Sequence, residues 1–235
     1  MFIHYRTLGI ILKKEDRGEA DQVFTILTKD FGKLKILGRA IRKIKSKLRA
    51  GAQPFYLSEI EFIQGKAYKT LTDAILVEKF EKIRKDLDKL DTASRVVEVL
   101  DNLVKGEEAD EGIWKLALET FKKLDFSPIP YFLIYHYFFW NFLSILGYMP
   151  ELRDCPLCQK GLTPANIYFS SEQGGLVCGN CFKEKGEKIN PEIVKILRIL
   201  IKKDWATLSK LKIKPEYEEE LEKISEDYLS YFSSI

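Results

Sequence analysis

Four cysteines, grouped in two pairs of identical spacing, limit how the C-terminal half of this chain can fold. They are Cys155 and Cys158 in CPLC and Cys178 and Cys181 in CGNC, with 19 residues between the pairs. Each pair presents two thiolates from one tight turn, and the segment between them is long enough to form a hairpin that brings the two turns together. The spacing predicts a four-cysteine metal site, with zinc as the first choice of metal.

Other sulfur chemistry stays open as an alternative for these cysteines. Four thiolates in a tetrahedron also suit iron or an iron–sulfur cluster, and two disulfides would use the same residues. No His or carboxylate at a comparable spacing offers an open coordination position for a substrate. The expected site is therefore structural, and loss of one thiolate should loosen the local fold.

The first 78 residues carry the pattern of short β-strands. Runs rich in β-branched and aromatic residues alternate with turn segments such as KDFGK. Strands are expected at residues 7–14, 22–28, 34–39, 55–65 and 69–78. Five short, mostly antiparallel strands fit a small barrel better than a sandwich, which needs more strands. The apolar positions of the fourth run alternate irregularly, which predicts a bulge near Ser58.

Beyond residue 78 the apolar residues recur at the three- and four-residue steps of helices. Helices are expected at residues 87–104, at 113–124, from the SPIP segment to residue 148, at 191–203 and at 215–232. The expected fold class is therefore α+β with two domains. Residues 1–78 form a barrel, and residues 79–235 form a helical domain with an inserted four-cysteine site at 155–181.

Residues 126–150 contain no charged side chain and are long enough to cross a bilayer. They include three prolines, four tyrosines, a His, an Asn and two serines, and their flanks are not basic on one side only. Because polar groups are costly in lipid, we interpret this segment as a buried helix and expect no membrane association. The N-terminus also lacks the pattern of a signal peptide, so export is not expected.

The positive charge of the sequence is concentrated near the N-terminus. Residues 1–78 hold 15 Lys and Arg against 9 Asp and Glu, a net charge of +6, whereas the remainder has a net charge of −3. The segment GKLKILGRAIRKIKSKLRAG, residues 32–51, holds eight cations and no carboxylate: Lys33, Lys35, Arg39, Arg42, Lys43, Lys45, Lys47 and Arg49. Such a run is either a solvated loop or a surface for a polyanion. On a small barrel with aromatic residues nearby it favours nucleic-acid binding through phosphate neutralisation.

Motifs for catalysis are missing from the sequence. The two histidines, His4 and His136, have no nucleophile near them in sequence, and we find no phosphate-binding glycine loop, no GxSxG and no paired carboxylate motif. We interpret His136 as a core residue of the apolar helix. A binding protein, and not an enzyme, is expected.

The order of these parts resembles the RecO family of bacterial recombination mediators. The landmarks GEAD, FGK and QPF in the N-terminal region, and FLSILGYMPELRDCPLCQK with GGLVCGNC further on, carry the resemblance, which covers nearly the whole chain. It implies an oligonucleotide-binding (OB) barrel followed by a helical domain. The structural zinc of the family would be held by Cys155, Cys158, Cys178 and Cys181.

The resemblance also implies a function. Proteins of this family bind single- and double-stranded DNA, anneal complementary strands and, with the partner RecR, help RecA replace single-stranded-DNA-binding protein. Family DNA contacts correspond to Lys35 and Arg39 here, and the other six cations of residues 32–51 are our extension from charge alone. The implied location is the cytoplasm, at the nucleoid.

The sequence departs from the family pattern in two respects. The segment between Cys158 and Cys178 is its own, and the C-terminal region is net acidic, which favours partner binding there, for example at an apolar site for the tail of single-stranded-DNA-binding protein. Two other functions stay open: a zinc-ribbon RNA-binding adaptor in translation or transcription, and a protein-binding scaffold. Competition between matched DNA and RNA strands separates the three.

Overall fold

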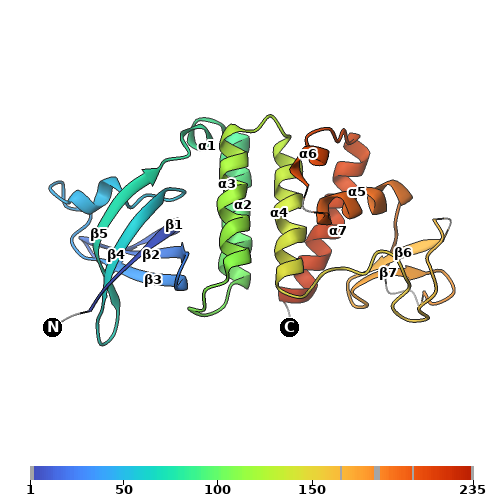
Figure 1. Ribbon diagram of the computed structural model, residues 1–235, viewed down its shortest axis with the longest axis horizontal. Helices are drawn as coiled ribbons and strands as arrows, with labels where there is room; N and C mark the ends of the chain where they lie inside the picture. The colour runs from blue at the N-terminus through green and yellow to red at the C-terminus, as the bar shows by residue number, and fades with distance from the viewer. Residues whose placement is uncertain (1–2, 165, 183–185, 203, 234–235) are drawn as a thin grey trace. The chain divides into compact units, whose positions relative to one another are not determined.

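The computed structural model describes residues 3–164, 166–182, 186–202 and 204–233. The chain forms two compact units, Met1–Ser127 and Pro128–Ile235, and each is considered by itself. Among the described residues, the first unit contains a β-barrel, a 3₁₀ helix and three α-helices, and the second contains four α-helices and a small sheet (Figure 1). The domain boundary at residue 78 stays a prediction.

Five strands of the first unit close into a barrel with the order β1-β2-β3-β5-β4, as the sequence predicts. The strands are β1 (His4–Arg17), β2 (Asp21–Thr28), β3 (Gly32–Gly38), β4 (Leu57–Gln64) and β5 (Lys69–Glu78). All neighbours are antiparallel except β3 and β5, which pair in parallel at two positions. The barrel is therefore closed by one short parallel contact.

Two strands of the barrel bend where their register shifts. The first half of β1 pairs with β4 and the second half pairs with β2, with a register shift between Ile11 and Lys13. The predicted irregularity in β4 is confirmed, because its register with β5 shifts between Leu57 and Ser58 and again between Glu61 and Phe62. Such bulges increase the local twist and bend that barrel closure requires.

Alternate residues of the strands fill the barrel. Phe24, Ile26, Leu34, Ile36, Ile60 and Phe62 are among the fully or almost fully buried members of this core. Phe31 belongs to the packing as well, because its ring meets the rings of Tyr5 and Phe62 edge-on at 5.6 Å. Ile41 and Leu48, from the segment after β3, also pack against the core. The long segment between β3 and β4 is therefore held at two points by apolar contacts.

Glu61 on β4 links its strand to both neighbouring strands, β1 and β5, through side-chain contacts. Its carboxylate lies 2.8 Å from His4 Nδ1 and 3.1 Å from an Arg6 guanidinium nitrogen, and it accepts a hydrogen bond from Thr72 on β5. Hydrogen bonds from His4, Arg6 and Thr72 lower the pKa of Glu61 from 4.5 to about 2. The deprotonated carboxylate therefore stabilises the folded state.

The barrel should lose stability in acid through Glu61. Between pH 4.5 and about 2 the unfolded chain binds a proton at Glu61 that the folded chain does not, so its contribution is present above pH 4.5 and declines as the pH falls towards 2. Urea unfolding of the natural chain and of Glu61→Gln, compared from pH 6 to pH 3, measures this. The variant should show a shallower loss of stability with acid, and equal slopes would contradict the assignment.

Three helices complete the first unit: α1 (Glu81–Lys85), α2 (Leu87–Leu103) and α3 (Glu111–Phe126). Asp86 and Asp110 accept backbone N–H bonds at the starts of α2 and α3, as N-cap residues do. The short helix α1 was not expected from the sequence. The buried Asp125 carboxylate on α3 accepts hydrogen bonds from the backbone N–H groups of Lys82 and Ile83 in α1. The single turn of α1 is therefore supported by a residue that is distant in sequence.

The second unit is built around α4 (Tyr131–Ile145), in which every residue from Leu133 to Leu143 is buried. Around it lie β6 (Ile167–Ser170), β7 (Gly175–Cys178), β8 (Glu187–Lys188), α5 (Pro191–Ile201), α6 (Trp205–Leu208) and α7 (Pro215–Ser233). The predicted helix 191–203 ends earlier, at Ile201, and residue 203 lies outside the described residues. Over the described ranges, no helix has both the length and the apolar character needed to span a membrane.

Two polar side chains of α4, Asn141 and His136, are hydrogen-bonded, whereas the buried Asn141 Oδ1 and Trp140 Nε1 have no partner among the described residues. Asn141 donates to the carbonyl oxygens of Tyr137 and Leu200 at 2.8 Å. His136 is fully buried, with Nε2 3.1 Å from the Glu222 carboxylate and Nδ1 3.1 Å from the Ser225 hydroxyl, both on α7. These hydrogen bonds explain how polar side chains are tolerated in a buried helix.

Candidate nucleic-acid interface and metal centre

The cations of residues 32–51 lie on β3 and on the segment that follows it. Side chains alternate along β3, so that Lys33 and Lys35 face away from the barrel core while Leu34 and Ile36 fill it. The segment after β3 ends in a 3₁₀ helix, Lys47–Ala50, and at Gly51. A Cβ atom on Gly51 would lie 1.9 Å from the Ala74 carbonyl oxygen, so glycine permits the close approach of this segment to β5.

Seven of the eight predicted DNA-binding cations are exposed to solvent: Lys35, Arg39, Arg42, Lys43, Lys45, Lys47 and Arg49. Arg42 has a carboxylate partner, because its guanidinium lies 3.3 Å from Asp16. Within the described part of the chain, the other six have no carboxylate within 4.0 Å. Their charge is therefore available to a polyanion.

Lys33 differs from the other seven. Its ammonium donates to the backbone carbonyl of Asp101 on α2 and lies 3.2 Å from the Asp101 carboxylate, which also accepts from Lys13 at 2.6 Å. Burial opposes ionisation of Asp101, but hydrogen bonds from Lys13 and Lys33 outweigh it and lower the pKa of this carboxyl. Lys33 thus connects the barrel to α2. Its role in DNA binding stays a prediction, and its bonds to Asp101 should make its contribution smaller than that of Lys35.

Three features of this surface were missed in the sequence. Ile44 is 94% exposed in the middle of the cationic segment, between the inward-facing Ile41 and Leu48. Lys14 on β1 lies close enough to Arg49, and to Arg84 on α1, for their charges to interact with its own. No local pattern marks Lys14 or Arg84, because only the fold brings these distant segments together. The exposed Ile44 could have been noted as an apolar residue within a charge run.

The four cysteines come together as predicted. Their Sγ atoms all lie within 4.8 Å of one another, and those of Cys158 and Cys178 are 3.7 Å apart. A tetrahedral zinc ion with Zn–S bonds of about 2.3 Å holds its sulfur atoms roughly 3.8 Å apart, whereas a disulfide requires about 2.05 Å. The donor set and its spacing therefore fit a metal ion and not a pair of disulfides.

The electrostatics of the cluster also favour a cation. Burial opposes ionisation of Cys155, but backbone N–H groups of Cys178, Cys158 and Leu157 donate to its sulfur and lower its pKa to about 6. Hydrogen bonds with Cys178 and Cys158 raise the pKa of Cys181 to about 12. Four neighbouring thiolates repel one another, and a divalent cation would remove that repulsion.

The hairpin between the two cysteine pairs is formed by β6 and β7, as the spacing predicts. It pairs Ile167 with Cys178, which places the second pair at the end of β7. A Cβ atom on Gly175 would lie 2.2 Å from the Glu151 carbonyl oxygen, so only glycine allows β7 to bridge the segment leading to the first pair. Phe169 on β6 meets Trp140 on α4 and Tyr228 on α7, which joins the metal site to the helical core.

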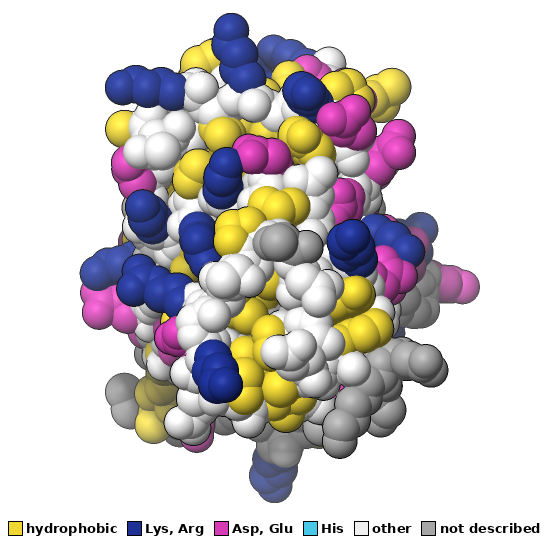
Figure 2. Space-filling model, turned by 90° about the vertical axis from the view of Figure 1, so that its right-hand side faces the viewer, with side chains coloured by type: hydrophobic (Ala, Val, Ile, Leu, Met, Phe, Trp, Pro, Cys, Tyr) yellow, Lys and Arg dark blue, Asp and Glu magenta, His cyan; other side chains and the backbone are white. Residues whose placement is uncertain are grey.

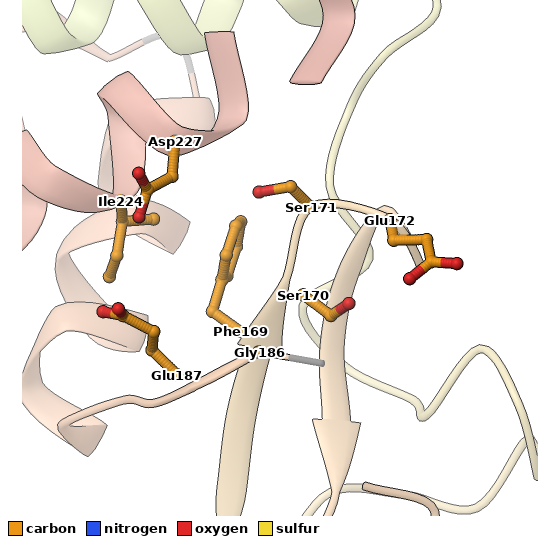
Figure 3. A pocket seen from close by; sticks show the side chains of 8 residues that line it. All are labelled: Phe169, Ser170, Ser171, Glu172, Gly186, Glu187, Ile224 and Asp227. Carbon is orange, nitrogen blue, oxygen red and sulfur yellow. The ribbon is translucent and has the colours of Figure 1, made fainter. Parts of the chain in front are cut away.

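An acidic pocket of about 260 Å³ lies beside the hairpin (Figure 3). Phe169 forms its wall, with carboxylates from Glu172, Glu187 and Asp227 around it. Glu187 is paired with Lys223 at 2.7 Å. We assign this pocket no chemistry.

The fold and the two sites define a class of protein. A small closed five-stranded barrel of this strand order is an OB fold, a scaffold that commonly binds oligonucleotides. Here it carries unpaired cations and is followed by helices with a four-cysteine cluster compatible with a metal.

Comparison with known proteins identifies the family. Residues 1–80 match the family model for the N-terminal part of recombination protein O, and residues 84–232 match that for its C-terminal part. A protein of Dehalococcoides mccartyi named DNA repair protein RecO is 35% identical over 219 residues, 93% of this chain and 86% of that protein. The DNA repair protein RecO of Moorella thermoacetica is 30% identical over 97% of this chain and 86% of its own length. That of a Thermoanaerobacter species is 29% identical over 95% of this chain and 90% of its own length. The chain belongs to the RecO family of DNA repair and recombination proteins.

Proposed function

We propose that this protein is a recombination mediator that binds single- and double-stranded DNA on its barrel and anneals complementary strands. The observation that carries the proposal is the set of exposed cations without carboxylate partners beside an OB barrel, in a member of the RecO family. Cations of this kind bind phosphates by releasing condensed counterions, independently of base sequence. Binding alone accounts for the activity, with no covalent step.

Annealing follows from charge neutralisation. Two DNA strands repel each other through their phosphates, and this repulsion opposes pairing. Lys35 and Arg39 are the primary phosphate contacts that we propose, with Arg42, Lys43, Lys45, Lys47 and Arg49 extending the surface. A strand held by its phosphates leaves its bases free to pair with a second strand. Ile44 is exposed within the same segment, and we propose that its side chain contacts those bases.

The metal that we propose for the four cysteines is a structural zinc ion. All four ligand positions of a tetrahedral ion would be filled by Cys155, Cys158, Cys178 and Cys181, which leaves none for a substrate. Zinc would hold the two cysteine turns together and support the hairpin. We place this protein in the cytoplasm, at the nucleoid, where its DNA substrate lies.

The partners that we propose are RecR, single-stranded-DNA-binding protein and, indirectly, RecA. A groove of about 660 Å³ in the second unit suits the tail of single-stranded-DNA-binding protein. It is lined by Met149, Pro150, Glu151, Leu152, Arg153, Arg198, Ile201 and Lys202. The face drawn in Figure 2 likewise carries apolar side chains next to those of Lys and Arg. Arg153, Arg198 and Lys202 outnumber the one carboxylate of the lining, Glu151, so the groove has a net positive charge that suits an apolar peptide with carboxylates.

Met149→Asp should weaken the binding of single-stranded-DNA-binding protein. Met149 is 56% exposed in the groove, so the substitution adds a charge at the docking surface without disturbing the core. Because a carboxylate there would repel an acidic tail and lose an apolar contact, we expect at least a 10-fold loss in affinity, measured by calorimetry. Affinity for bare DNA should not change, and unchanged partner binding would exclude this groove.

Competition between matched DNA and RNA strands tests the DNA function. Labelled single-stranded DNA bound to the protein is displaced by unlabelled DNA or RNA of the same sequence, at several salt concentrations. We expect salt-dependent binding and displacement by DNA at least as good as by RNA. A clear preference for RNA would point to recognition of the 2′-hydroxyl and contradict the proposal. Salt-independent, weak binding of both would favour a protein-binding scaffold.

A further inference from the structure

A polar pocket on the barrel gathers cations from separate segments of the first unit. Its volume is about 270 Å³. It is lined by Lys14, Gln22, Ile41, Arg42, Arg49 and Gln53, which come from β1, β2, the segment after β3, the 3₁₀ helix and the approach to β4. Lys14 lies outside the basic run of residues 32–51, so the pocket depends on the tertiary fold and not on that run alone.

Side-chain amides hold the cations of this pocket in place. Lys14 Nζ donates to Gln53 Oε1 at 2.8 Å, and Gln53 Nε2 donates to the Arg49 carbonyl oxygen at 2.9 Å. On the other side, Gln22 Nε2 donates to the Asp16 carboxylate at 2.8 Å, and Arg42 pairs with the same carboxylate at 3.3 Å. The Lys14 ammonium and the Arg42 guanidinium are therefore held in place before any ligand binds, and Gln53 also fixes the backbone at Arg49.

The pocket holds more positive than negative charge. Arg84 approaches from α1, where its guanidinium lies 4.5 Å from the centre of the Tyr56 ring. Burial, together with the charges of Arg49 and Arg84, lowers the pKa of Lys14, while Asp16 acts in the opposite direction. Cations held together in this way repel one another, and the single carboxylate of Asp16 does not neutralise them. An anion would relieve the repulsion.

We propose that this pocket binds one phosphate group of a nucleic acid, with Lys14 and Arg49 as its principal ligands. The inference rests on the proposed function and deepens it, because it names a single anchoring site within an otherwise diffuse basic surface. Lys14 supplies a point charge, and Arg49 supplies the planar donor groups that suit phosphate oxygens. The phosphate is either an internal phosphodiester or the phosphate at the 5′ end of a strand.

The test is a double-mutant cycle of Lys14→Met and Arg49→Met on binding to a 3′-labelled oligothymidine, measured by anisotropy. Each single variant should weaken binding about 5- to 10-fold. Because both groups contact one phosphate, the double variant should lose little more than either single variant. If Lys14 and Arg49 contacted DNA independently, the fold-losses in affinity of the two single variants would multiply in the double variant. That result would overturn the proposal that both bind one phosphate.

Two arms of the experiment identify the source of the phosphate. Oligothymidines with a 5′-hydroxyl and with a 5′-phosphate are compared for every variant. An equal loss for both shows that the pocket binds an internal phosphodiester, and a loss confined to the phosphorylated strand shows that it binds the terminal phosphate. Lys105→Met, which removes an exposed cation from the segment between α2 and α3, is the matched control and should bind as the natural chain does.

Folding and the broader proposal are separated by two further measurements. Removing Lys14 relieves repulsion, so the thermal midpoint of Lys14→Met without DNA should be unchanged or higher, and Lys14→Arg should retain binding. If the natural chain shows salt-dependent DNA binding and the Lys14 and Arg49 variants bind DNA equally well, the phosphate pocket is wrong but the broader proposal of a basic DNA-binding surface stands. If the natural chain itself shows no salt-dependent DNA binding, the proposed function fails.

Discussion

Replacing Lys35 and Arg39 together by Glu should abolish strand annealing while the protein stays folded. Both side chains are exposed and have no carboxylate partner within the described residues, so the substitutions break no internal ion pair. Each lost phosphate contact reduces the slope of log affinity against log salt by about 1, so the slope should fall by about 2. Reversed charges also repel the strand, so we expect annealing to fall to the rate without protein, a slowing of roughly 10-fold or more.

The measurement is annealing of complementary fluorescent oligonucleotides, with metal content and thermal unfolding as checks on the fold. Retained annealing would refute the placement of the DNA contacts. Lys33→Met provides a matched comparison on the same strand, because Lys33 is already bound to Asp101. It should leave the salt slope nearly unchanged and lower stability instead, whereas Lys35→Met should reduce the slope by about 1.

Cys155→Ala should release the zinc ion that we propose and unfold the region of the four cysteines. Cys155 is fully buried within the cluster, and a three-thiolate site binds zinc far more weakly than a four-thiolate one. Structural zinc contributes on the order of 10 kcal/mol in small zinc domains, so its loss should remove most of the stability of the hairpin. Bound metal, cooperative unfolding of the second unit and the fluorescence of Trp140, which contacts Phe169 of the hairpin, report the change.

Leu157→Ala is the control for this substitution. Leu157 lies between Cys155 and Cys158 and is half-exposed, so its truncation keeps all four thiolates. It should retain metal and unfold as the natural chain does. At moderate temperature Cys155→Ala should keep salt-dependent DNA binding, because the cations lie in the other compact unit. Full stability after loss of the thiolate and the metal would show that the cluster is not structural.

Local patterns in the sequence account for most of the fold. Alternation of apolar residues predicts the five strands, and the irregularity at Ser58 marks a real shift of register. The single-turn helices α1 and α6 were missed, because elements of 5 and 4 residues show no periodicity. The length of β1 was also underestimated, since this strand pairs with two neighbours in two registers.

The candidate sites were predictable to different degrees. The four-cysteine cluster follows from spacing alone, because each pair of cysteines lies in one turn and a short hairpin joins the pairs. The contact of Lys33 with Asp101 could not be predicted from sequence spacing, because Asp101 lies 68 residues further along the chain. The approach of Lys14 to Arg49 likewise depends on barrel closure and on the path of the segment after β3. Charge runs therefore identify a surface, but the fold decides which of its cations are free.

The most direct test of the mediator function is the rate at which two complementary strands pair when each is coated with cognate single-stranded-DNA-binding protein. The rate is measured with and without this protein, at low and at high salt. We predict acceleration that weakens as salt rises, because phosphate contacts on the barrel carry the effect. Unchanged pairing of the coated strands, with DNA binding retained, would contradict the role as a mediator.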